Sequence, residues 1–223
     1  MRNIEVNFIF LARLFVFLPR ILKSKGESFC FQPRYNRNEE MKDDELLICD
    51  AVESDAPFIA LVVAMALGGD EKHFLYEVFC KLSVMENSQY SYRNSMVAKV
   101  NGKNVAAIVA YDGALLHQLR EPLQEQIKAH LGHTMDIEDE TSAGEYYIDS
   151  FAVLPQYRNR GIGRRLLMAM RDKVFSKGYE RLGLIVDFDN PKAEQLYASM
   201  GFVRINETTF LGHKMWHMQV NKS

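Results

Sequence analysis

One stretch of this 223-residue chain constrains its fold most: an apolar run that passes through a turn rich in Gly and Arg into an amphipathic segment. Tyr146–Leu154 predicts a buried strand, and Ile162–Lys177 repeats apolar residues at helical spacing. Gly161 and Gly163 permit a close approach of the backbone. Because the first N–H groups of a helix lack intrahelical partners and the helix dipole is positive there, this turn favours an anion. Nearby arginines add charge and predict a phosphate-bearing ligand: Arg158, Arg160, Arg164 and Arg165.

The order of residues in this turn excludes two common phosphate-binding patterns. A Walker loop needs Lys and then Ser or Thr after its last Gly, whereas Arg164 and Arg165 follow Gly163. The dinucleotide fingerprint needs a third Gly, but position 166 is Leu. The turn therefore belongs to another class of phosphate site.

The rest of the chain alternates strand-like runs with helical patterns, which predicts an α+β (mixed α/β) domain. Asn101-Gly102 favours a type I′ turn and so predicts a hairpin. Pro122 should kink or restart the helix predicted at Leu115–Leu131. Further strands are predicted at Leu46–Val52, Ser95–Val100, Val105–Tyr111, Arg181–Asp187, Phe202–Ile205 and Lys214–Val220, and further helices at 56–68, Glu71–Met85 and Pro191–Met200.

Composition and charge narrow the class of protein. Values of 48% hydrophobic and 25% charged residues are typical of a globular protein with a core. The formal net charge of -2 gives no global positive field, so we expect no nucleic-acid partner. The three cysteines are an odd number without metal-ligand spacing, and the histidines also lack such spacing. We therefore expect no metal site and a reducing, cytoplasmic location.

The first 40 residues differ from the rest, with seven basic and four acidic residues. Arg13 interrupts their apolar runs and Pro19-Arg20 ends them, which makes the segment too short and too charged for a spanning helix. No small-residue cleavage site follows, so we also do not expect a signal peptide. We interpret 1–40 as a dispensable or poorly ordered appendage and 41–223 as the functional domain. The alternative is that 1–40 lies on a membrane or protein surface; otherwise we expect no membrane partner.

Two blocks of residues resemble the GNAT-type N-acetyltransferase superfamily. Val153-Leu154-Pro155 and the following Arg158, Gly161 and Gly163 are similar to the central signature of this family. A second block is similar to its strand, Asn-x-x-Ala helix and Tyr-x-x-x-Gly-Phe ending: Leu184-Ile185-Val186, Asn190, Ala193, Leu196-Tyr197 and Gly201-Phe202. The resemblance covers roughly 46–220 and is specific from Tyr146 to Phe202.

This resemblance implies a mixed, mostly antiparallel central sheet, flanked by helices and splayed where acetyl-coenzyme A (acetyl-CoA) binds as cosubstrate. It implies that the backbone of Phe151, Ala152 and Val153 pairs with the pantetheine arm. Asn190 would contact the same arm. The pyrophosphate would be held by the turn and the start of the helix: Arg158, Asn159, Arg160, Gly161, Ile162, Gly163 and Arg164.

Acetyl transfer to an amine needs an uncharged nitrogen and a proton for the departing thiolate. The resemblance implies that Tyr197 is the general acid, and a phenol stays protonated at neutral pH. Asp149, in an otherwise apolar strand, is the candidate general base acting through water, with a structural hydrogen-bonding carboxylate as the alternative. Strand alternation would place Asp149 on one face with Tyr147, Phe151 and Val153.

The acceptor is less constrained than the chemistry. Ser88–Tyr92 is polar and aromatic, so it could orient a substrate or form a strand edge. The acidic stretch 136–140 is interpreted as a solvated loop, although it could also favour a cationic amine. We expect an N-acetyltransferase acting on a primary amine of a small molecule or peptide. The alternatives are a protein N-terminal or lysine acetyltransferase and a noncatalytic acyl-coenzyme A-binding module. The oligomeric state stays open, with a homodimer as one option.

Overall fold

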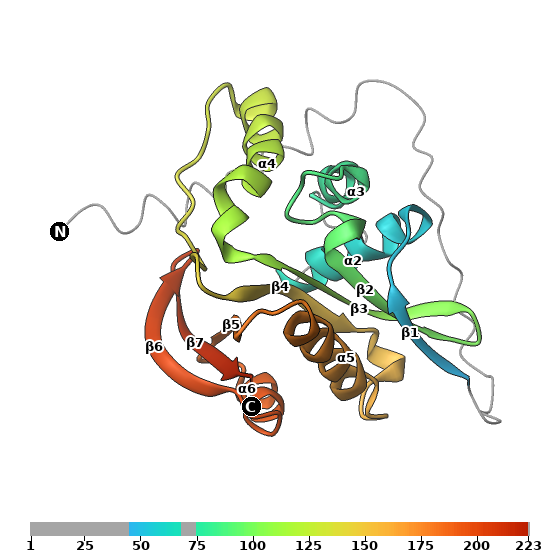
Figure 1. The fold of residues 1–223 in the computed structure, drawn as a ribbon. Helices are drawn as coiled ribbons and strands as arrows, with labels where there is room; N and C mark the ends of the chain where they lie inside the picture. The colour runs from blue at the N-terminus through green and yellow to red at the C-terminus, as the bar shows by residue number, and fades with distance from the viewer. Residues whose placement is uncertain (1–44, 68–74, 223) are drawn as a thin grey trace.

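A computed structural model of the chain describes residues 45–67 and 75–222 (Figure 1). The described strands form one sheet in the order β1-β2-β3-β4-β5-β7-β6. Only β4 and β5 run parallel, and all other neighbours are antiparallel. The predicted mixed, mostly antiparallel sheet is confirmed. The strands are β1 (Leu46–Asp50), β2 (Ser95–Val100), β3 (Lys103–Asp112), β4 (Tyr146–Val153), β5 (Arg181–Asp187), β6 (Val203–Phe210) and β7 (His213–Asn221).

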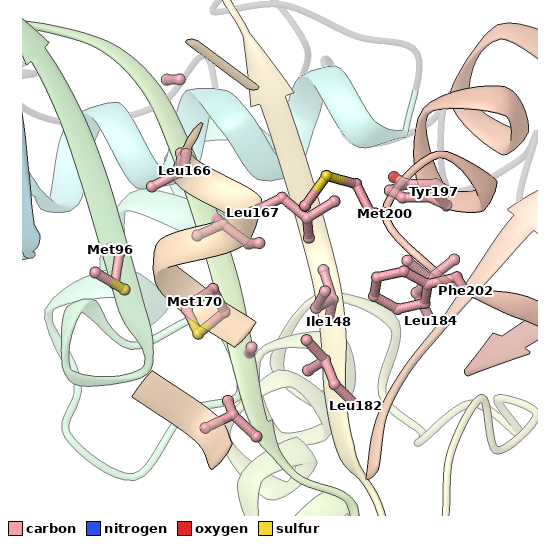
Figure 2. Packing of buried hydrophobic residues seen from close by; sticks show 14 of the residues in the cluster. Met96, Ile148, Leu166, Leu167, Met170, Leu182, Leu184, Tyr197, Met200 and Phe202 are labelled. Atoms are coloured by element: carbon pink, nitrogen blue, oxygen red, sulfur yellow. The ribbon is translucent and has the colours of Figure 1, made fainter. Parts of the chain in front are cut away.

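Helices cover both faces of the sheet (Figure 1). On one face lie α2 (Ala56–Ala66), α3 (Tyr76–Val84) and α4 (Leu116–Leu131); on the other lie α5 (Ile162–Ser176) and α6 (Pro191–Ala198). The largest core cluster lies on the α5 face, where Leu166, Leu167 and Met170 pack towards Ile148 of β4 (Figure 2). The predicted helix-flanked architecture is therefore confirmed. The appendage 1–40 and residues 71–74 of an expected helix lie outside the described residues.

Most local expectations hold, with two exceptions. Asn101 and Gly102 adopt φ of 50° and 76°, the positive values that the predicted type I′ hairpin requires. However, the alternative that α4 restarts at Pro122 is wrong, since Pro122 lies inside one continuous helix, and a kink there stays a prediction. β6 also runs to Phe210, five residues beyond the predicted end at Ile205. The extension was not predicted because residues 206–209 are polar. They can still form a strand because β6 is an edge strand that is exposed to solvent.

A β-bulge at Asp149 interrupts the pairing of β4 with β3. Val109 pairs with Ser150 and Ala110 pairs with Ile148, so Asp149 has no residue opposite it. A bulge inserts one unpaired residue and bends the strand. It therefore also reverses the alternation of side chains beyond this point.

The bulge corrects the prediction about which side chains share a face of β4. Tyr147 packs with Tyr111 on the α4 face. Phe151 and Val153 instead pack on the α5 face, together with Ile148. The expectation that Tyr147, Phe151 and Val153 lie on one face is wrong, because it assumed an unbroken two-residue period.

The two parallel strands at the middle of the sheet separate after a short contact. Their pairing runs from Tyr146 opposite Leu182 to Ile148 opposite Leu184. The remaining residues of β4, 149–153, have backbone groups on this side that are not used by β5. The sheet is thus splayed as expected, and we call this space the β4–β5 opening. None of the described helices combines the length and the apolar character that crossing a membrane would need.

Candidate active site

The turn between β4 and α5 is held against the end of β4. Nε of Arg158 donates a hydrogen bond of 3.0 Å to the carbonyl of Val153. A Cβ added to Gly163 would lie 3.2 Å from both Phe151 Cζ and Val153 Cγ2, so glycine lets α5 approach the strand closely. The structure therefore brings together the predicted pantetheine strand and the predicted pyrophosphate turn.

The start of α5 is available to an anion. Gly161 is the N-cap residue with a φ of 75°, and it supplies no side-chain cap to the first-turn N–H groups. Ile162 is buried, so only its backbone can face a ligand. Asn159 also adopts a positive φ, 61°, which helps the turn to fold back over the helix start.

The predicted basic residues of the turn are exposed, and Arg160 and Arg164, like Arg158, have partners in the structure. The Arg160 guanidinium lies 5.2 Å from the ring centre of Tyr157. Nη1 of Arg164 donates to Ser199 Oγ at 2.9 Å, which ties the start of α5 to the end of α6. Uncapped N–H groups, exposed guanidinium groups and the close approach at Gly163 fit a diphosphate, so the residues present suit coenzyme A.

The second predicted block lies at α6. Asn190 caps this helix, since its Oδ1 accepts a hydrogen bond of 3.2 Å from the Ala193 N–H. Tyr197 packs beside Met200 and Phe202 in the α5-face core (Figure 2). Burial raises the pKa of the Tyr197 phenol to about 12. The phenol therefore keeps its proton at neutral pH, as an acid requires.

Asp149 lies on the other side of β4, in a polar network. Its Oδ1 accepts from Ser150 Oγ at 2.8 Å, and its Oδ2 accepts from Gln89 Nε2 and from Tyr111 Oη, each at 3.1 Å. Burial raises the pKa of the Asp149 carboxyl, although these hydrogen bonds oppose the shift. Gln89 comes from the Ser88–Tyr92 stretch, for which the sequence leaves two interpretations open, orienting a substrate or forming a strand edge.

Two residues of this network were missed by sequence reasoning. Glu140 is only 8% exposed, so its interpretation as part of a solvated loop is wrong. It forms an ion pair with Arg120, which also binds Asp139 Oδ1 at 3.0 Å. The available signal was Arg120 itself, because it lies four residues after the buried Leu116 and so falls on the buried face of α4.

A second buried carboxylate ties β4 to β7. Glu145 Oε2 accepts from Gln219 Nε2 at 2.6 Å and lies 3.0 Å from His217 Nε2, while Thr141 Oγ1 donates to Oε1 at 2.7 Å. Burial raises the pKa of Glu145, but these partners more than offset it and leave the pKa below its ordinary value. No local sequence pattern pairs His217 with Glu145, because 72 residues separate them.

The acid and base candidates thus lie on opposite faces of the sheet. Tyr197 belongs to the α5-face core, whereas Asp149 bonds to residues on the α2 and α4 side. β4 lies between the two side chains, and its edge from 149 to 153, which β5 does not pair with, borders the β4–β5 opening. An acyl donor held by the α5 turn and an acceptor approaching from the Asp149 side would meet there.

A family model described as the acetyltransferase (GNAT) family matches residues 70–202, more than half of the chain. The chain belongs to the GNAT acetyltransferase family. This membership confirms the resemblance seen in the sequence and the fold class. Acetyl-CoA is the cosubstrate that goes with it, in agreement with the fit of the α5 turn.

Several known proteins similar to this chain are named as acetyltransferases. A crystal structure titled simply as that of an acetyltransferase has 31% sequence identity and a TM-score of 0.65, covering 78% of this chain and 98% of its own. Mycothiol acetyltransferase of Renibacterium salmoninarum is 36% identical over 70 residues, which are 31% of this chain and 20% of that protein. N-alpha-acetyltransferase RimI of Mycobacterium tuberculosis is 44% identical over 61 residues, 27% of this chain and 37% of that protein. The chain thus matches well under half the length of these two curated relatives.

Proposed function

We propose that this chain is an acetyl-CoA-dependent N-acetyltransferase that acts on a primary amine of a small molecule or peptide. The observation that carries the proposal is the β4–β5 opening, which has an anion-binding helix start on one face and a hydrogen-bonded carboxyl group on the other. When bound, acetyl-CoA would supply the acetyl group as a thioester.

The residues that would bind acetyl-CoA lie in the turn before α5, in β4 and at the start of α6. The exposed guanidinium groups of Arg158 and Arg160 and the N–H groups at Gly161 to Arg164 would hold the pyrophosphate. The free edge of β4 from Phe151 through Ala152 to Val153 would pair with the amide groups of the pantetheine arm. Asn190 lies at the start of α6, from which its side-chain NH₂ can still donate.

Asp149 would be the general base. An ammonium group must lose a proton before nitrogen attacks a carbonyl carbon, and a carboxylate can accept that proton directly or through one water. Asp149 retains partial exposure, unlike Glu140 behind it, so it is the carboxyl group of the network that an acceptor can approach.

Tyr197 would protonate the departing sulfur at its hydroxyl group. Its raised pKa keeps the phenol protonated, and a preorganised donor stabilises the charge that develops on a leaving group. The acid on one face and the base on the other would let one proton leave the nitrogen as another reaches the sulfur.

The class of acceptor separates two versions of this function. By their names, one relative is a mycothiol acetyltransferase and another is an N-alpha-acetyltransferase. We propose a small-molecule or peptide amine for this chain because α4 and the 134–139 segment stand beside the Asp149 network. A protein N-terminus remains the rival acceptor.

An amine panel with detection of released thiol tests the function. The panel should contain small primary amines, peptides with different N-terminal residues and peptides with an internal lysine. We expect thiol release that depends on one class of amine. Binding of acetyl-CoA without thiol release for any amine would instead indicate a noncatalytic binding module.

We also propose a cytoplasmic location, because the chain has three cysteines, an odd number without the spacing of a disulfide framework. Fractionation of cells that express the tagged full chain checks this. Recovery in a membrane or secreted fraction would contradict it and would draw attention to residues 1–40.

A further inference from the structure

Two carboxyl groups beside the β4–β5 opening share one hydroxyl group. Tyr111 Oη lies 3.1 Å from Glu140 Oε1 and 3.1 Å from Asp149 Oδ2. A phenol has a single hydrogen, so Tyr111 can donate to only one of these carboxyl groups at a time. The second contact is a hydrogen bond only when the other carboxyl group is protonated and donates to the phenol oxygen. One proton can therefore move along these three side chains, Asp149, Tyr111 and Glu140, which we call the relay.

The charges around the relay favour one proton that is retained by the pair of carboxyl groups, Asp149 and Glu140. The buried guanidinium of Arg120 pairs with Asp139 and Glu140 and also acts electrostatically on Asp149, and like charges held close together oppose full ionisation. Burial and, after it, the neighbouring Asp149 raise the pKa of Glu140 to about 7, against the effect of Arg120. The charged and titratable groups facing the Glu140–Asp149 pair are Tyr90, Tyr111, Arg120, Asp139 and Tyr147.

The two ends of the relay, Asp149 and Glu140, have different surroundings. Asp149 is partly exposed and belongs to the strand that borders the β4–β5 opening. Glu140 lies on the far side of Tyr111 and pairs with Arg120. Arg120 and Asp139 line a cavity of about 650 Å³ between α4 and the 134–139 segment. Glu140 does not line this cavity itself, but its partner Arg120 does, and Asp139, which binds the same guanidinium, is exposed to solvent.

We propose that Glu140, acting through the Tyr111 hydroxyl, is a positioning residue that takes the proton from Asp149 in each turnover. The proposal rests on the proposed N-acetyltransferase function. Asp149 first accepts a proton from the acceptor ammonium group. It then donates this proton to Tyr111 Oη while the hydroxyl hydrogen of Tyr111 passes to Glu140, and Glu140 releases it to water. Of the two protons that the ammonium nitrogen loses, this relay releases one to water, and the other restores the proton that Tyr197 gives to the departing sulfur.

The relay makes opposite predictions for two substitutions in the full chain. Tyr111→Phe removes a hydrogen bond that favours ionised Asp149, so the acid limb of the kcat/KM pH profile should move to higher pH. Glu140→Gln removes a negative charge near Asp149 and leaves Arg120, so the same limb should move to lower pH. Each change should lower kcat by about tenfold or more, with KM for acetyl-CoA unchanged.

Tyr147→Phe is the matched control. It also removes a hydroxyl group from a buried tyrosine, whose ring centre lies 5.9 Å from that of Tyr111, but it leaves the bridge between the carboxyl groups. We expect the wild-type pH profile for this variant. Limbs that stay in place, or that move in one direction for both test variants, would overturn the relay.

A titration of the side-chain carboxyl groups by ¹³C NMR tests the shared proton without any turnover. In the wild type, one carboxyl group of the pair should titrate near neutral pH, and Glu140→Gln should move the Asp149 transition to lower pH. Complete ionisation of both groups by pH 5 would overturn the proposal even in an active enzyme. A shared proton in a protein that acetylates no amine would instead count against the acetyl-transfer function.

Discussion

Tyr197 shows how burial sets the chemistry of a single side chain. The residue packs between Met200 and Phe202, and burial raises the pKa of its phenol to about 12. Ionisation of this phenol should therefore not reduce activity at any pH below about 11, since less than about a tenth is ionised there. An acid limb of the pH profile must come from other groups, such as Asp149 and Glu140.

Replacing the phenol tests its role directly. Tyr197→Phe keeps the ring in the core and removes only the hydroxyl group, so we expect kcat to fall by about 10²–10⁴-fold, the usual range for loss of general acid catalysis. The affinity for acetyl-CoA should stay nearly the same. Steady-state kinetics and calorimetry measure the two effects, with Tyr179→Phe as a control because its hydroxyl group contacts Asp112 instead. Full activity of Tyr197→Phe would remove it as the acid.

Gly161 tests the placement of the diphosphate. Gly161→Glu places bulk and negative charge where we propose that anionic oxygens bind, and we expect at least about a tenfold loss of acetyl-CoA affinity, or about 1.4 kcal/mol. Gly178→Glu is a matched control near the other end of α5, since both glycines have positive φ values, 75° and 91°. Equal affinities of folded Gly161→Glu and Gly178→Glu in calorimetry would refute the placement.

At the scale of elements, Glu145 joins a loop, β4 and β7. Its carboxylate accepts hydrogen bonds from Thr141 and Gln219 and pairs with His217, while its carbonyl accepts from Gly113 N–H at 3.0 Å. A Cβ on Gly183 of β5 would lie 1.9 Å from Glu145 Oε2, so the carboxylate also fills the space above that strand. Glu145 therefore stabilises the paired end of β4 and β5.

The lowered pKa of Glu145 makes this contribution dependent on pH. A carboxyl group whose pKa is lower in the folded state stabilises the fold above its unfolded-state pKa, and this contribution falls away as pH drops. Glu145→Gln should cost about 1–3 kcal/mol of unfolding free energy at pH 7 and less at pH 4. Urea unfolding at both values measures this, with the exposed Glu121→Gln as control. A cost that is the same at both pH values would contradict the ionic contribution.

The sequence predicted most elements because their local signals agree with their tertiary environment. Asn101-Gly102 has the turn chemistry of its hairpin, and Arg181–Asp187 was predicted with the bounds that β5 has. The bulge at Asp149 could not be predicted, because an extra residue in one strand depends on pairing with β3. The same limit explains the error about the faces of Phe151 and Val153.

The candidate site likewise has one part that the sequence predicts and one part that it does not. The turn around Gly161 is contiguous in sequence, so its anion-binding character follows from local features. The Asp149 network assembles Gln89, Tyr111 and Glu140 from separate segments, and no local pattern joins them. Glu140 was misjudged because an acidic run is usually solvated, whereas Arg120 draws this one carboxylate into the interior.

At the scale of the whole molecule, the small net charge conceals a separation of charge. The turn before α5 is basic, whereas the 136–140 segment beside α4 is acidic. An anionic cofactor and a cationic acceptor would thus be drawn to different faces of the sheet. This arrangement suits a reaction between two ligands of opposite charge.

The proposed functional domain begins near residue 41, since all residues of the site come after it. We expect a chain shortened to 41–223 to keep the acetyl-CoA affinity of the full chain within about twofold, because every predicted cofactor contact is retained. Calorimetry and thermal unfolding of both chains measure this. A loss of affinity or solubility in the shortened chain would show that 1–40 contributes to the domain.

The short contact between β4 and β5 has a mechanical consequence. Among the described residues, three residue pairs make up the strand pairing between the β1–β4 part of the sheet and the part formed by β5, β7 and β6, and Glu145 adds side-chain hydrogen bonds to β7. The two parts of the sheet are therefore paired only at one end of β4, at Tyr146–Ile148. A molecule that forms backbone hydrogen bonds with the free edge of β4 would bridge the two parts of the sheet and would restrict their motion relative to each other.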